Sequence, residues 1–157
     1  MMNKMPVTLL LQDLKHTDET VRDRATRELW RLWFEQKGST GLALLRRVQF
    51  LLELGDFDKA DELLELMLEQ QPDFAEAWNR RAVLYYVQEK YTEAIALCER
   101  VIQLNPIHFG ALHGLGLCHM ALGQYRNAIA AFHQALAVQP YSVENQRLLL
   151  ECLLKLN

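Results

Sequence analysis

The sequence predicts an all-α protein, a right-handed α-solenoid of antiparallel helix pairs. The first observation is that Pro72, Pro106 and Pro140 are equally spaced, at a step of about 34 residues, which indicates an internal repeat. An aromatic residue and an alanine recur at the same step. They are Phe57, Tyr91 and Tyr125, followed by Ala60, Ala94 and Ala128. A stack of equivalent units commonly presents a surface to another protein.

The second observation is helical periodicity within each unit. In the middle unit a first apolar stripe runs through Trp78, Ala82 and Tyr85, and a second runs from Tyr91 through Cys98. These steps of three and four residues match an α-helix rather than a strand. Each proline lacks an N–H and disfavours helix at the residue before it. Each unit is therefore expected to contain two helices, with the proline between units.

Small residues recur where two helices must approach closely. They are Ala60, Ala94 and Ala128 on the second helices and Gly116 on a first helix. A larger side chain at such a contact would overpack it, typically at a cost of ~1–3 kcal/mol.

These residues resemble the tetratricopeptide repeat (TPR), whose pattern runs from a Trp through Leu-Gly, Tyr and Ala to a Pro. The matching positions are Trp78, Tyr85, Ala94 and Pro106, and then Leu115, Gly116, Ala128, Phe132, Ala135 and Pro140. Arg47 and Arg81 depart from the pattern at its usual Leu position, and Val48 replaces its glycine. The resemblance implies three TPR units, at 41–74, 75–108 and 109–142.

The segment before these units is expected to be a degenerate helical pair at 7–40. Counting back one repeat from Leu64 and Met67 leads to Trp30 and Trp33, so this pair is predicted to cover the first unit. Core packing is the favoured role for the two tryptophans, and an exposed aromatic contact for a partner is the alternative.

The segment after the third unit, 143–157, is expected to be a single capping helix. Leu149, Leu150 and Leu153 are predicted to cover the third unit, because a repeat array needs its apolar ends closed. All of 1–157 is thus predicted to form one domain.

The sequence at 28–33, together with the three repeats, also resembles small cyanobacterial and plastid TPR proteins. That narrower resemblance implies a role in the assembly of a photosystem or another large complex.

Composition disfavours several classes of protein. The formal net charge is −3, and no basic cluster interleaved with aromatic residues points to nucleic acid. No apolar run reaches the ~20 residues of a membrane span. Three cysteines at helical, buried-looking positions favour reduced thiols. A cytoplasmic location is therefore expected.

Acidic residues gather between Glu53 and Glu76, where Lys59 is the only basic residue. Such a run on an amphipathic helix is usually a solvated outer face. The alternative is a docking patch for a basic partner.

No pattern for catalysis, a cofactor or a metal is evident. His113 and His119 lie six residues apart, about 600° around a helix, so they are expected to point to different sides. Neither a Cys-x-x-Cys pair nor a glycine-rich phosphate loop occurs. We therefore expect a protein that is not an enzyme.

The candidate binding surface is the concave side, which the first helices line in stacked helix pairs. One face of these helices is largely apolar and defines the predicted partner-binding residues. They are Leu45, Gln49, Leu52, Asn79, Val83, Tyr86, His113, Leu117 and Met120. Some TPR domains grip the terminal carboxylate of chaperone tails through Lys, Asn and Arg in this groove. Leu45 and Gln49 stand where the Lys and Asn are expected, which disfavours that ligand.

We therefore expect an adaptor that binds a peptide or helix of another protein in this groove, with Asn79 holding the ligand backbone. A possible homodimer is the alternative, in which copies associate through the groove or through the aromatic N-terminal helix. A third reading is that the chain's own terminal segment fills the groove.

Overall fold

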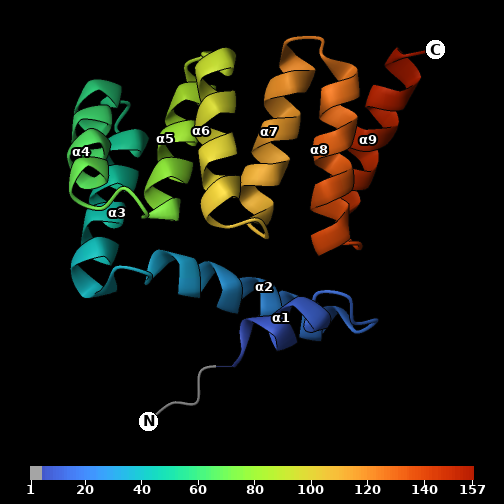
Figure 1. The fold of residues 1–157 in the computed structure, drawn as a ribbon, viewed down its shortest axis with the longest axis horizontal. Helices are drawn as coiled ribbons and strands as arrows, with labels where there is room; N and C mark the ends of the chain where they lie inside the picture. Colours follow the sequence, from blue (N-terminus) through green and yellow to red (C-terminus); the bar gives the residue numbers. More distant parts are fainter. Residues whose placement is uncertain (1–4) are drawn as a thin grey trace.

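The computed structural model describes residues 5–157, and every regular element in that range is an α-helix (Figure 1). In chain order these helices are α1 (Val7–Asp13), α2 (Glu19–Phe34), α3 (Gly38–Glu53), α4 (Phe57–Gln70), α5 (Ala75–Val87), α6 (Tyr91–Leu104), α7 (Phe109–Ala121), α8 (Tyr125–Val138) and α9 (Val143–Lys155). The helices from α3 to α8 form three antiparallel pairs, and α9 packs beside α8. The expected all-α solenoid is confirmed.

The turn inside each pair has the same backbone form. Gly55, Glu89 and Gly123 follow the first helix of their pairs, and all three have a left-handed φ of 74°, 61° and 73°. A residue in this conformation closes a helix, and glycine adopts it with no penalty from a Cβ atom. Glu89 makes the same turn as a non-glycine residue, so the tertiary fold imposes the turn geometry there.

The stack is held by apolar contacts between successive helices. Ala60, Ala94 and Ala128 are fully buried, as expected for close helix contacts. Between α4 and α5 an ionic contact is added, because Arg81 Nε donates to Asp61 Oδ1 at 2.8 Å. Arg81 thus departs from the repeat pattern but gains a partner on the preceding helix.

The N-terminal pair does not lie where the repeat count placed it. We expected 7–40 to stack on the first repeat, but α2 runs crosswise beneath the ends of the upright helices, with α1 packed against it (Figure 1). The buried cluster of this pair includes Leu10, Leu29 and Trp33, and it is completed by Phe109 at the start of α7. Its apolar face is therefore buried against the loops between repeats.

Helix α2 and the short segment after it contact three equivalent positions, one after each repeat proline. Lys37 Nζ lies 2.8 Å from Asp73 Oδ2, and Ile107 packs against the α1–α2 cluster. The Arg22 guanidinium lies 4.1 Å from the centre of the Tyr141 ring. Since Asp73, Ile107 and Tyr141 occupy the same place in successive repeats, α2 ties the three repeat junctions together.

The two α2 tryptophans serve core packing. The Trp33 ring stacks on His108 at 4.3 Å between centroids, and Trp30 meets His108 and Phe109 edge-on, each at 5.3 Å. The favoured sequence interpretation is therefore confirmed. A homodimer through this aromatic helix loses its basis, because both rings face the repeats.

The C-terminal helix covers the third repeat with a different face from the predicted one. Leu148 and Cys152 are buried, and Leu149 packs against the same cluster as Phe132. Leu150, by contrast, is 57 % exposed. The prediction was wrong for Leu150 and also for Leu153, which is exposed. The helical period places positions 148, 149 and 152 together on the α8 side.

We predict that two glycines of α7 respond oppositely to alanine. A Cβ on Gly116 would lie 2.5 Å from the Phe132 ring, whereas a Cβ on Gly114 meets only Cys98 Sγ at 3.5 Å. Gly116→Ala should be less stable than Gly114→Ala by about 1–3 kcal/mol in urea unfolding. Gly114→Ala should match or exceed the wild type by up to about 1 kcal/mol, because alanine favours helix. Equal stability of the two variants would contradict the packing assigned to Gly116.

We also predict that Trp33→Ala lowers the free energy of unfolding by about 3–5 kcal/mol, since it empties a buried aromatic site. Arg27, exposed on the same helix, supplies the control, and Arg27→Ala should change stability by less than about 0.5 kcal/mol. Thermal or urea unfolding followed by circular dichroism measures both. A near-neutral Trp33→Ala would show that α2 does not stabilise the repeats.

Candidate partner-binding site

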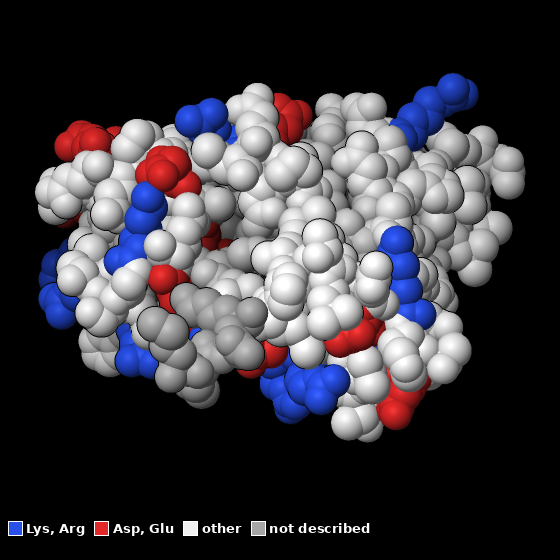
Figure 2. All heavy atoms as spheres, turned by 60° about the horizontal axis from the view of Figure 1, so that its bottom comes forward, with Lys and Arg blue, Asp and Glu red and all other residues white. Residues whose placement is uncertain are grey.

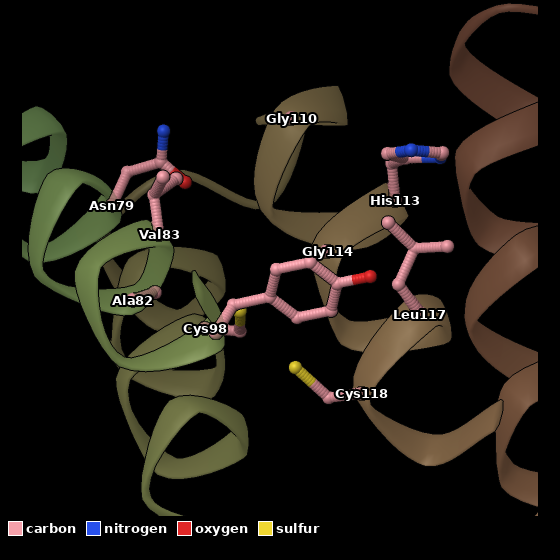
Figure 3. A pocket seen from close by; sticks show the side chains of 10 residues that line it. Asn79, Ala82, Val83, Cys98, Gly110, His113, Gly114, Leu117 and Cys118 are labelled. Atoms are coloured by element: carbon pink, nitrogen blue, oxygen red, sulfur yellow. The ribbon is translucent and has the colours of Figure 1, made fainter. Parts of the chain in front are cut away.

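A pocket of about 130 Å³ opens between α5 and α7 (Figure 3). Its lining is Asn79, Ala82, Val83, Tyr86, Cys98, Gly110, His113, Gly114, Leu117 and Cys118. Five of the nine sequence-predicted binding residues are in this set: Asn79, Val83, Tyr86, His113 and Leu117. The name α5–α7 pocket is used for it below.

Small residues create the space. Ala82 contributes one methyl group on α5, and Gly110 and Gly114 contribute no side chain on α7. Tyr86 also lines the pocket, and Leu117 lies across it from Ala82 and Val83 (Figure 3). A Cβ on Gly110 would lie 2.6 Å from Trp30 Cη2, so α2 reaches the edge of the pocket through this glycine.

The polar groups of the pocket are few and held in place. Burial raises the pKa of the Tyr86 hydroxyl, which keeps it a neutral hydrogen-bond donor and acceptor at physiological pH. His113 Nδ1 lies 2.6 Å from Asn145 Oδ1 on α9. Asn79 is buried, and its amide donates to Glu76 Oε1 at 3.2 Å.

Two buried thiols form the inner wall. The neighbouring Cys118 thiol, with burial as a further cause, raises the pKa of Cys98. Cys98 therefore stays a protonated, apolar thiol at neutral pH. The pocket floor is accordingly apolar, which suits an aliphatic or aromatic side chain.

The other four predicted residues do not line this pocket. Leu45 is buried in the core of the first repeat, so its assignment to the groove surface was wrong. Gln49 and Leu52 line a second hollow beside Arg80, which shares Val83 with the α5–α7 pocket. Met120 packs against the cluster between α8 and α9. The predicted face therefore divides between two hollows and buried clusters of the core.

A buried polar network beneath the groove was not foreseen from the sequence. Glu76 is fully buried, although it was counted within the acidic, solvated segment. Its Oε2 lies 2.8 Å from His108 Nε2, and its Oε1 accepts from Arg80 Nε at 3.0 Å. Burial of a carboxylate is tolerated because each of its oxygens has a partner.

The tautomer of His108 follows from its second contact. His108 Nδ1 accepts from the Ala111 backbone N–H at 3.0 Å and so caps the start of α7. With Nδ1 an acceptor, the proton lies on Nε2 and is donated to Glu76. The capping role of His108 could have been inferred from its place in the repeat, because His108 corresponds to Ser142, the N-cap of α9.

The remaining acidic residues between positions 53 and 76 are not a uniform solvated face. Asp61 pairs with Arg81, and Asp73 pairs with Lys37. Glu62 and Glu69 are exposed. On the side of the molecule that carries α1 and α2, basic and acidic side chains are interspersed, and the described part shows no large field of one sign (Figure 2).

Two structural features are absent from the described residues, 5–157. No group of three or more His, Cys, Asp and Glu side chains there is arranged to hold a metal ion. Within the same range no helix has the length and apolar character needed to cross a membrane.

Comparison with known proteins identifies the repeats. Tetratricopeptide repeat profiles match residues 42–84, 75–108 and 110–142. The chain belongs to the tetratricopeptide repeat family. A TPR repeat-containing protein of Rhizobium etli is 31% identical over 111 residues, covering 70% of this chain and 54% of that protein. The BBSome complex member BBS4 homolog of Drosophila melanogaster is 28% identical and covers 65% of this chain.

The chain spans only part of these relatives, about half of the Rhizobium protein and 21% of the Drosophila one. Among solved structures, the first TPR of Spaghetti (RPAP3) bound to the HSP90 peptide SRMEEVD superposes with a TM-score of 0.70 at 21% identity. That match covers 73% of this chain and 91% of the other. MamA MSR-1 superposes with a TM-score of 0.64 at 22% identity, covering 95% of this chain and 83% of the other. At these identities the structural matches show the fold.

We predict that the Glu76–His108 pair stabilises the fold only as a pair. His108→Leu should cost about 3 kcal/mol in urea unfolding, because it leaves one carboxylate oxygen buried without a partner. Adding Glu76→Leu removes that charge, so the double variant should cost less than the sum of the two single variants.

His133→Ala, at an exposed site on α8, is the control and should stay within about 0.5 kcal/mol of the wild type. Strict additivity of the two Leu substitutions would show that the Glu76–His108 contact contributes nothing.

Proposed function

We propose that this TPR protein is a non-catalytic adaptor that binds a peptide or helix of a partner protein through an apolar side chain seated in the α5–α7 pocket. The observation that supports this most directly is the convergence of five predicted groove residues on one apolar pocket. They come from two first helices of successive repeats, so a ligand held there would contact two repeats at once.

The size of the pocket favours a side-chain anchor over a small-molecule ligand. Sites for small molecules commonly have volumes of roughly 300–1,000 Å³, whereas this pocket has about 130 Å³. The apolar floor at Cys98 and Cys118 suits an aliphatic or aromatic group. The Tyr86 hydroxyl can bond to the backbone of the ligand. Asn79, whose amide is bonded to Glu76, is a weaker candidate for that role than the sequence suggested.

The class of ligand differs from that of the structural neighbour. The RPAP3 domain binds the peptide SRMEEVD, which carries three acidic residues. In the α5–α7 pocket the lining includes no Lys or Arg, and His113 is bonded to Asn145. A carboxylate would lose water there without gaining a cation. An apolar anchor is therefore favoured over an acidic tail.

The biological setting is proposed more broadly. Assembly of a larger complex in the cytoplasm suits an adaptor of this kind. None of the relatives described above is a cyanobacterial or plastid protein, so a photosynthetic role draws no support from them. A homodimer formed through the groove is the alternative function, and it would be detected as a concentration-dependent mass.

Site-specific crosslinking tests the proposal. Tyr86 is replaced by the photoreactive residue p-benzoylphenylalanine in the full chain, and the protein is irradiated in native lysate. A discrete crosslinked partner is expected, with the attachment mapped by mass spectrometry to an apolar segment. The same replacement at Glu62, exposed on α4, is the control. Crosslinks that form at Glu62 and not at Tyr86 would overturn the proposal, and a crosslinked pair of identical chains would favour the homodimer.

With that partner in hand, we predict that Tyr86→Ala weakens binding by about tenfold to a hundredfold in calorimetric titration, because interface energy concentrates in buried aromatic residues. The double substitution Glu62→Lys with Glu69→Lys should change affinity much less. Tyr86→Ala should leave the helical content unchanged. If the α4 variant loses affinity and Tyr86→Ala does not, the functional surface is the outer face.

A further inference from the structure

The first helix of the first repeat exposes one position that is buried in the other first helices of the stack. Phe50 on α3 is 56 % exposed, while its repeat equivalents Leu84, Cys118 and Cys152 are all buried. These three side chains lie under the second helix of the preceding repeat. In front of α3 that place is empty in the described structure, because α1 and α2 turn away beneath the stack (Figure 1).

The exposed surface continues along one side of α3. Ala43, Arg47, Phe50 and Leu54 share a helical face and are all exposed. Their repeat equivalents on α5 are Ala77, Arg81, Leu84 and Gln88, of which Ala77 and Leu84 are fully buried. These four residues, three on α3 and its C-cap Leu54, are called the α3 stacking face below.

The α4–α5 contact shows what such a face accepts. Leu84 lies in the same buried cluster as Leu64 of α4. Arg81 forms ion pairs with two carboxylates of α4. Its Nε lies 2.8 Å from Asp61 Oδ1, and its Nη2 lies 3.6 Å from Glu65 Oε1. Asp61 and Glu65 are one helical turn apart, beside the apolar stripe. An arginine on a stacking face is therefore paired with acidic residues of the covering helix.

In the later repeats the positions of Arg81 and Asp61 hold different residue types. The equivalents of Arg81 are Leu115 and Leu149, and the equivalents of Asp61 are Ile95 and Ile129. An ionic pair in one junction is thus replaced by an apolar pair in the next two. Since Arg47 has the residue type of Arg81, the helix that covers α3 is expected to carry a carboxylate and not an aliphatic side chain at this point.

We propose that the α3 stacking face is a docking site for an amphipathic α-helix of a partner protein, which presents a carboxylate to Arg47 and an aliphatic side chain to Phe50. This helix would continue the stack as α4 continues it toward α5. The site lies at the end of the repeat array and is separate from the α5–α7 pocket. Binding at either site is independent of the other.

A second copy of this chain fits the face less well. The second helices α4, α6 and α8 each have a following first helix packed on them. The exposed face of α9 offers Leu150 and Leu154, but it also carries Arg147, bound to Glu151 at 3.0 Å. If α9 covered the face with Arg147 beside Arg47, the two like charges would repel each other. An acidic helix of another protein avoids this repulsion.

A synthetic peptide with the sequence of α4, Phe57–Gln70, labelled with fluorescein, is the probe, and binding to the full chain is followed by fluorescence anisotropy. Arg47→Glu should weaken binding by about tenfold, and Phe50→Asp by at least about tenfold, because each removes a central contact. Both side chains are exposed, so the melting temperature should change little. Arg46→Glu makes the same charge change on an exposed neighbour outside the face and should keep affinity within about twofold.

A charge exchange gives the decisive result. A peptide in which the residues equivalent to Asp61 and Glu65 are lysine should bind Arg47→Glu better than the wild type. If Arg46→Glu and Arg47→Glu lost the same amount of affinity, the effect would come from the net charge of the protein and the proposal would be overturned. Unchanged binding by Phe50→Asp would overturn the proposal as well. The peptide would then bind elsewhere, for example by displacing helix α4 of the protein.

Sedimentation of the protein without peptide decides between a partner helix and a second copy. A monomeric mass is expected at all concentrations. A concentration-dependent mass that Phe50→Asp abolishes would make the α3 stacking face a contact between copies and would overturn the partner-helix assignment. Tyr86→Ala should bind the probe like the wild type, so failure at this face and failure at the α5–α7 pocket are separable.

Discussion

The structure depends on one contact that recurs at each step of the stack, in which the second helix of a pair covers the first helix of the next. Neither helix can bury its apolar face alone, so each repeat depends on its neighbours. The contact is close because its positions are small, as at Ala94 and Ala128. At the α4–α5 junction Asp61 and Arg81 add an ion pair to it. Where no helix supplies this cover, as on α3, the same residues become a surface.

The N-terminal helices stabilise the array in a different way. Helix α2 crosses the loops between repeats, and Trp33 stacks on His108, which in turn is bonded to the buried Glu76. Aromatic packing outside the repeats is thereby connected to a polar pair inside them. In the described part of the chain this arrangement leaves α3 uncovered at the end of the array, since the segment that could have capped it lies beneath the repeats. The position of α2 beneath the repeats and the exposure of the α3 stacking face thus have a common cause.

Two separate surfaces follow from these contacts. The α5–α7 pocket forms because Ala82, Gly110 and Gly114 leave room between adjacent first helices. The α3 stacking face forms because, among residues 5–157, no second helix of a preceding repeat packs on α3. The first suits a single apolar anchor and the second suits an acidic helix, so one adaptor of this fold could hold two different segments. Each surface is defined by side chains that do not contribute to the other.

The sequence by itself determined the fold class and the repeat register, because proline spacing and helical periodicity are local and recur at the same step. It also brought Asn79, Val83, Tyr86, His113 and Leu117 together, since helical phase and register are sufficient for that. Only the tertiary structure decided that α2 lies across the repeats, that Leu45 is buried, and that Glu76 is bonded to His108. These outcomes depend on which side chains meet between different repeats and between α2 and the repeats, and the repeat period alone does not specify those pairs.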